Sequence, residues 1–231
     1  MSRWGVGDDR EAGETGAHVP RPEHRWPMAV AVLTAVFLQV GLPHRGRVPG
    51  WWVIPVLEIV LLATLVVQDP GRIDRLSKDL RRSTVALVAV MTAGTLLAAV
   101  FLVHDIFDGR TGVKAADLIG RGAAIWLTNI IVFSLWFWEF DRGGPARRAH
   151  HLTVPASFAF PENAMPELAA PGWTPQYTDY LYLSFTNATA FSPTDTLPLR
   201  TWAKMIMIIE AVLSLAIAVL VIARAINVLP G

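Results

Sequence analysis

Five long apolar blocks occupy much of the chain, at residues 27–43, 51–68, 84–104, 120–140 and 201–228. A helix that crosses a bilayer needs about 20 mostly apolar residues, with a working range of about 17–25. The composition agrees, because 53% of the 231 residues are hydrophobic and 17% are charged, which is too apolar for an ordinary soluble domain. Each block therefore predicts one transmembrane helix of an all-α integral membrane protein.

A further segment, residues 178–195, is too short to cross a bilayer. It begins with an aromatic-apolar run from Asp179 to Phe185, continues into a polar turn, and precedes the last full-length helix. Lipid tolerates irregular backbone at depth only where protein or water covers it. The layout predicts one re-entrant, pore-type half-helix in addition to the five transmembrane helices.

These segments divide the chain into three regions. Residues 1–25 are polar and contain five acids, so we expect a disordered tail. Residues 26–119 form a three-helix N-terminal membrane region. Residues 120–231 form the second membrane region, whose parts are the 120–140 helix, a Pro-rich loop at 143–177 without regular helix, the half-helix at 178–195 and the final helix at 201–228.

Basic residues in short loops predict the orientation. The 69–83 loop holds five of them, Arg72, Arg75, Lys78, Arg81 and Arg82, whereas the 44–50 loop holds two. The N-terminus, the 69–83 loop and the 141–200 segment are therefore expected in the cytoplasm of a cell whose inner (plasma) membrane the chain crosses. Five crossings then place the C-terminus outside.

Several classes of chemistry find no support in the sequence. There is no cysteine for a disulfide or a thiolate metal site, and the net charge of +1 does not favour nucleic acid. The histidines lack zinc-like spacing, and no phosphate loop, dinucleotide fingerprint or nucleophile elbow is present. We expect no enzyme activity, no metal and no cofactor.

Two sets of polar residues are the candidate functional sites. The pore or constriction candidates crowd into the polar turn and are Thr186, Asn187, Thr189, Ser192, Thr194 and Asp195. They could line a pore or hold a hydrated cation, or they could cap the half-helix. The intramembrane acids Glu58 and Glu210 could bind ions or carry protons, or each could be a protonated acid hydrogen-bonded to a neighbouring helix.

The polar turn also has a characteristic spacing. Thr189 and Asp195 are followed by Pro198, Trp202 and Lys204. This spacing resembles the pore region of two-helix potassium channels, in which a pore helix ends in a Thr-rich filter with an Asp, a Pro follows, and the inner helix begins.

The resemblance implies a pore helix and constriction from Asp179 to Asp195 and a conduit lined by the 201–228 helix. Glu210 would lie on the wet face of that helix, and Ser214 falls where such channels often carry a hinge glycine. Ser192 and Thr194 stand in place of the two filter glycines, whose backbone freedom they lack. The channel-like expectation is therefore a pore that passes monovalent cations without a glycine-type potassium filter.

The same region resembles a family of uncharacterised bacterial polytopic membrane proteins. The shared motifs are Phe160-Pro161, the block from Asp179 to Thr186, Thr194-Asp195 and Ala225-Ile226-Asn227. This family implies a fold and no activity.

Two functions stay open. One is a channel-like homo-oligomer, a tetramer by the channel resemblance, with the lipid bilayer and a monovalent cation as partners and without nucleic acid. The other is a non-conducting membrane scaffold that retains the helical hairpin, packed shut by Phe185 and Phe191. The channel resemblance would also place the C-terminus inside, opposite to the orientation that the basic residues predict.

Overall fold

The computed structural model describes residues 22–41, 50–73, 75–107, 115–150, 154–167, 169–190 and 195–228. This part of the chain is mostly helical. Three of its helices are long and apolar enough to cross a membrane, namely α3 (Lys78–Phe107), α4 (Ala115–Phe140) and α8 (Thr201–Val228). The final helix has the predicted bounds of 201–228.

Two shorter apolar helices precede them, α1 (Trp26–Gly41) and α2 (Val53–Gln68), with 16 residues each. At 1.5 Å per residue each is about 24 Å long, which is less than the roughly 30 Å of a typical hydrocarbon core. Both overlap the predicted spans at 27–43 and 51–68 and are shorter than the three long helices.

Helix α3 corrects the predicted loop at residues 69–83. It begins at Lys78, six residues before the predicted span at 84–104, with the Ser77 hydroxyl 3.4 Å from the Leu80 amide and Asp79 in the first turn. A capping hydroxyl and an early acid favour a helix start, and hydropathy does not detect either. Three of the five basic residues assigned to the predicted 69–83 loop therefore lie on α3 itself.

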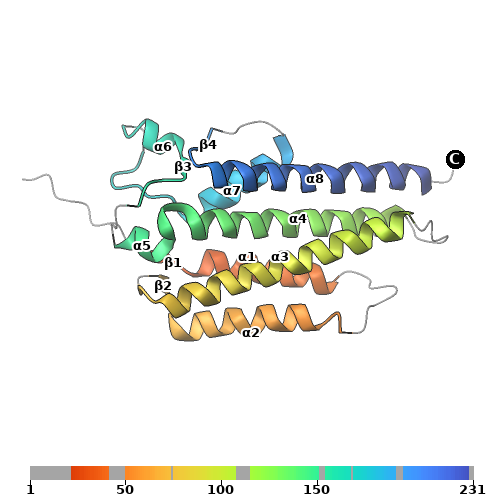
Figure 1. Ribbon diagram of the computed structural model, residues 1–231, viewed down its shortest axis with the longest axis horizontal. Helices are drawn as coiled ribbons and strands as arrows, with labels where there is room; N and C mark the ends of the chain where they lie inside the picture. Colours follow the sequence, from red (N-terminus) through yellow and green to blue (C-terminus); the bar gives the residue numbers. More distant parts are fainter. Residues whose placement is uncertain are drawn as a thin grey trace, which may run out of the picture.

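Helix α4 is the centre of the bundle (Figure 1), packing against α1, α3, α7 (Tyr177–Ala190) and α8. In the most apolar 18-residue stretch of α4, 67% of the stretch is buried inside the protein, whereas the share is 28% in the corresponding stretches of α3 and α8. Small residues permit the closest approaches. A Cβ at Gly122 would lie 2.5 Å from Val221 of α8, and one at Gly94 of α3 would lie 2.9 Å from Ile54 of α2.

Two short antiparallel pairings tie distant segments together at one end of the bundle (Figure 1). Strand β1 (Glu23–His24) pairs with β2 (Arg72–Ile73), and β3 (Phe158–Ala159) pairs with β4 (Leu197–Pro198). The segments that the basic residues assign to one side of the membrane therefore share one end of the fold.

The predicted tail at 1–25 extends too far. Glu23 and Arg25 are only 5% and 4% exposed, and Arg25 Nη2 lies 2.7 Å from Asp69 Oδ2. A charged residue can be buried when it is paired, and composition alone does not show its partner. Residues 1–21 lie outside the described chain.

The Pro-rich segment contains more helix than predicted. After a 3-10 turn at Asp141–Gly143, it includes α5 (Pro145–Ala149) and α6 (Pro161–Ala164), each with its proline in the first turn. Proline fits there because that position has no helical partner for an N–H. The high density of proline therefore prevents long helices in this segment but permits helices of about one turn.

The predicted half-helix is α7 (Tyr177–Ala190), 14 residues long. It starts at the end of the bundle that carries the strands, and the chain is back at that end at β4 (Figure 1). The Asp179 carboxylate accepts a hydrogen bond of 2.7 Å from the Gln176 amide and so caps the first turn. The predicted segment continued to 195, but the helix ends at Ala190.

Candidate functional site

A hydrogen-bonded cluster around the carboxyl of Glu210 joins three helices in the interior. Glu210 lies on α8 and is 0% exposed. Asn187 of α7 donates to Glu210 Oε2 at 2.7 Å and to the Met207 carbonyl at 2.9 Å. Ser184 of α7 hydrogen-bonds to Glu210 Oε1 and, at 2.7 Å, to the Ile130 carbonyl of α4. Ser184 thus holds the half-helix to α4, and Ser184 and Asn187 together hold it to Glu210 of α8.

The protons in this cluster can be counted. The Ser184 hydroxyl has one hydrogen, and a backbone carbonyl such as that of Ile130 only accepts. If Ser184 donates to Ile130, its bond to Glu210 requires a hydrogen on the carboxyl. The hydrogen bonds of Ser184 to Ile130 and to Glu210 can each contain a separate proton only when Glu210 is a neutral acid. A neutral acid also avoids placing a charge in the hydrocarbon.

Further polar pairs extend this interior along α4. Asn129 Nδ2 donates to the Ser214 hydroxyl of α8 at 3.1 Å, and the Ser134 and Tyr177 hydroxyls are 2.8 Å apart. All four side chains are buried. Since hydrogen bonds between helices hold membrane bundles together, this interior is a set of satisfied links between α4, α7 and α8.

The four predicted constriction residues that the structure describes do not share one environment. Asn187 points inward to Glu210, whereas Thr189 and Asp195 are exposed and Thr186 is half-buried. The hydroxyls of Thr186 and Thr189 each bond to carbonyls of their own helix, such as those of Tyr182 and Phe185 at 2.8 Å. Ser192 and Thr194 lie outside the described residues.

The expectation that Glu210 lies on a wet face is wrong for this chain. Its side chain faces α7 and is enclosed by Ser184 and Asn187. The hydrogen bonds to Ser184 and Asn187 of α7 agree with the alternative, a protonated acid bonded to a neighbouring helix, whose protonation stays a prediction. Ser184 was missed as a site residue, although its three-residue spacing from Asn187 places both on one face of a helix.

Glu58, the other intramembrane acid, belongs to a different part of the bundle. It lies on α2 against Gly94 of α3 and is 0% exposed. Gln39 Nε2 donates to Glu58 Oε1 at 3.1 Å, while Oε2 has no hydrogen-bond partner among the described residues. The two acids therefore do not form one site, and the described residues contain no group of acids and histidines that could hold a metal.

A second polar cluster closes the end of the bundle and was not predicted. Arg148 of α5 is buried; its Nε donates to Glu23 Oε1 at 2.8 Å and its Nη1 to the carbonyls of Trp138 and Asp141 at 2.9 Å. Trp138 Nε1 donates to the other Glu23 oxygen at 2.7 Å. Burial opposes the charge of Arg148, but Tyr180, Glu23 and Asp141 outweigh it and raise the pKa of the guanidinium above its ordinary value.

Asp141 extends this cluster to the half-helix. Its Oδ2 accepts from the Tyr180 hydroxyl of α7 at 2.7 Å, and its Oδ1 accepts from the Ser157 amide at 2.6 Å. These partners are distant in sequence and carry no local motif. The cluster fixes the entry of α7, as the Glu210 cluster fixes its middle.

The chain matches no known protein-family model, no curated protein and no solved structure. The resemblances to two-helix potassium channels and to a bacterial membrane family therefore stay predictions.

Proposed function

We propose that this chain is an integral membrane protein of five transmembrane helices and one re-entrant helix, α7. The support comes from its surface, where large apolar side chains face outward along whole helices. On α8 these are Met205, Ile208, Ile209, Val212, Leu215, Val219, Ile222 and Ile226. Water would not tolerate so continuous an apolar surface, whereas lipid would.

The short helices α1 and α2 fit this proposal if the bilayer adapts to them. A bilayer can thin around a short apolar segment at a cost of a fraction of a kcal/mol per Å. The buried pair of Arg25 and Asp69 joins the start of α1 to the end of α2. This pairing favours a hairpin whose two open ends lie at one membrane surface.

Within this protein, α4, α7 and α8 would form a channel-like module. The observation that carries this proposal is the order of a full-length helix, a half-helix that starts at the strand end of the bundle, a return of the chain to that end at β4, and a second full-length helix (Figure 1). Among the described residues, Ser184 and Asn187 fill the contact between α7 and α8, which argues against a conduit at that contact inside one chain. The conduit would therefore form between copies of the chain in a homo-oligomer.

This arrangement changes the roles of the candidate residues. Asn187 and Glu210 hold the module together, and the outward residues Thr186, Thr189 and Asp195 would face the conduit. An exposed carboxylate at its mouth would favour monovalent cations over anions. Ser192 and Thr194 stay candidates from the sequence.

Cation flux into liposomes that contain the purified full-length chain tests the proposal. Asp195→Asn and Thr189→Val should each lower the flux several-fold. The matched controls Glu167→Gln and Thr34→Val change an exposed acid before α7 and an exposed threonine on α1, whose hydroxyl also bonds to its own helix, and should leave the flux unchanged. Equal flux in all four variants, or none in the wild type, would remove the channel function.

A non-conducting scaffold is the second candidate, and one observation favours it. The hydroxyls of Thr186 and Thr189 are satisfied by their own helix, so this face of α7 needs no water. Of the two rings expected to pack this segment shut, Phe185 is 47% exposed and meets Trp126 edge-on at 6.2 Å, and Phe191 lies outside the described residues. A folded chain without flux would support the scaffold.

A further inference from the structure

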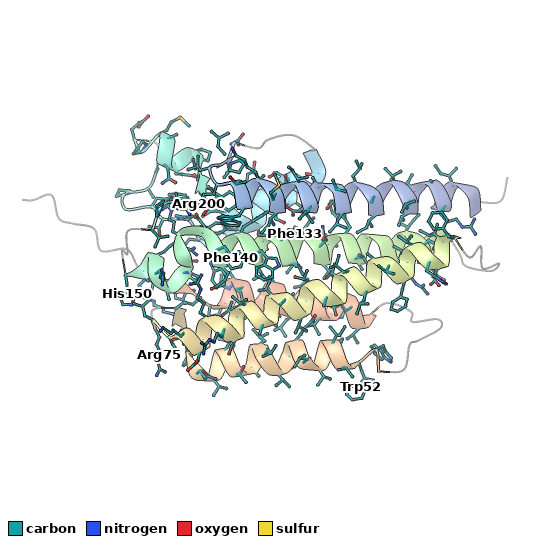
Figure 2. The ribbon with its side chains drawn as sticks, viewed as in Figure 1. Trp52, Arg75, Phe133, Phe140, His150 and Arg200 are labelled. Carbon is teal, nitrogen blue, oxygen red and sulfur yellow. The ribbon has the colours of Figure 1, made fainter. Side chains whose placement is uncertain are left out.

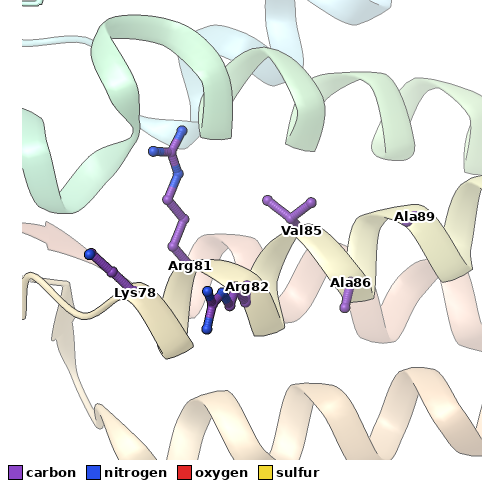
Figure 3. A pocket seen from close by; sticks show the side chains of 6 residues that line it. All are labelled: Lys78, Arg81, Arg82, Val85, Ala86 and Ala89. Atoms are coloured by element: carbon purple, nitrogen blue, oxygen red, sulfur yellow. The ribbon is translucent and has the colours of Figure 1, made fainter.

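The first turns of α3 carry a groove in which charge and apolar surface meet. The groove has a volume of about 490 Å³ and is lined by Lys78, Arg81, Arg82, Val85, Ala86 and Ala89 (Figure 3). Its three bases come first in the sequence, at the end of the bundle where β1 and β2 pair. Its apolar residues follow one and two turns deeper, so the groove changes from cationic to apolar along the helix.

Acidic neighbours cancel only part of the charge of this groove. Arg81 Nε lies 3.3 Å from Glu139 Oε1, but that carboxyl is buried beneath it. Arg82 Nη1 lies 3.3 Å from Asp79 Oδ1, and both of those side chains are largely exposed. An exposed ion pair of this kind contributes about 0–1 kcal/mol, so a stronger anion can displace it. Lys78, the third base of the groove, has no ion pair with the described residues, so the groove keeps a positive excess of its own.

The apolar part of the surface continues beyond the groove. Ala86, Ala89 and Ala93 are exposed on α3, and the larger Leu97 and Val100 follow on the exposed surface of the helix. Small residues close to the bases leave room beside the helix, and larger ones border the surface farther down. A ligand that fits it has an anionic head and a long apolar tail.

We propose that this groove binds one anionic phospholipid, with its phosphate at Lys78, Arg81 and Arg82 and an acyl chain along Ala86 and Ala89. Basic side chains at the membrane surface recognise anionic headgroups in this way. The proposal rests on the membrane location proposed above and is independent of ion conduction. A free anion would use the bases and leave the apolar surface uncovered.

Competitive lipid binding to the full-length chain in detergent, followed by native mass spectrometry, tests the charge requirement. Phosphatidylglycerol and phosphatidylcholine with identical acyl chains are the probes. The wild type should prefer phosphatidylglycerol, and K78Q/R82Q should weaken its binding about 30-fold, given the usual contribution of two basic side chains. Arg81 is left intact because it contacts Glu139.

The matched control is R72Q/R75Q, which removes two exposed bases at the same end of the bundle but outside the groove. It should change phosphatidylglycerol binding less than about threefold if the groove supplies the specific contacts. Equal losses in the two double variants would show diffuse surface attraction and overturn the site. A wild type without headgroup preference would overturn it as well.

The acyl-chain requirement has its own test. Ala89→Phe should fill the groove and weaken phosphatidylglycerol binding, whereas Val212→Phe, at an exposed position on α8, should not. Inorganic phosphate should fail to displace the lipid; displacement would identify a simple anion site and contradict the proposal. Carbonate extraction of native membranes tests the membrane location separately, so its failure is distinguishable from failure of the groove.

Discussion

At the level of single residues, buried polar groups are tolerated here where each one has a partner. One carboxyl oxygen of Glu210 accepts a hydrogen bond from Asn187, and the other is hydrogen-bonded to Ser184. Glu23 accepts from Trp138 and from Arg148. Leaving one buried group unpaired costs about 1–3 kcal/mol, and more when the group is charged. The two clusters therefore contribute to stability through partners that substitutions can remove one at a time.

Substitutions of Glu210 test its protonation. Gln has the shape of a neutral Glu and can donate to Ser184 while accepting from Asn187, so Glu210→Gln should change the unfolding free energy by less than about 1 kcal/mol. Glu210→Ala leaves Asn187 and Ser184 without this partner and should cost about 2–4 kcal/mol. Reversible unfolding in mixed micelles measures both. An equal loss in the two variants would indicate that Glu210 is an ionised carboxylate.

The end cluster predicts a larger loss at Glu23. Glu23→Ala leaves Arg148 buried without its carboxylate partner, and breaking such a pair costs about 3–5 kcal/mol. Glu162→Ala, a less buried acid of the same end, is the control and should cost less than about 1 kcal/mol. The thermal midpoint in detergent is the measurement. A similar midpoint for both variants would contradict a stabilising role for Glu23.

At the level of elements, sequence reasoning located the long helices because a run of about 20 apolar residues has few other uses. The same reasoning underestimated α3 at its N-terminus, where a polar turn extends the helix beyond its apolar run. It also missed the link between Glu23 and Arg148, which are 125 positions apart. A contact of that kind depends on how α1, α4 and α5 pack, and no local pattern records it.

The contact between α4 and α8 gives an element-level prediction. A Cβ at Gly122 would lie 2.5 Å from Val221, so Gly122→Ala should push the helices apart and cost about 1–3 kcal/mol. Val221→Ala makes room, and the double variant should recover most of that loss, giving a favourable coupling energy. Thermal unfolding of the four proteins completes the cycle. Additive losses would show that the two residues do not share this contact.

At the level of the whole molecule, the two ends of the bundle differ in construction. One end holds both strand pairs and the buried ion pairs, and Arg75, His150 and Arg200 lie there (Figure 2). Trp52 lies toward the opposite end, at the start of α2 (Figure 2). If the membrane surrounds the helices, these two ends face opposite aqueous sides.

Single cysteines can test this sidedness cleanly because the chain has none of its own. An impermeant maleimide should label Arg75→Cys and Met165→Cys from the same side of sealed vesicles, and Trp52→Cys from the other. The excess of basic residues predicts that the first pair faces the cytoplasm. Labelling of residues 52 and 75 from one side would mean that α2 does not cross. The five-span arrangement would then be wrong, while the three long helices could still cross the membrane.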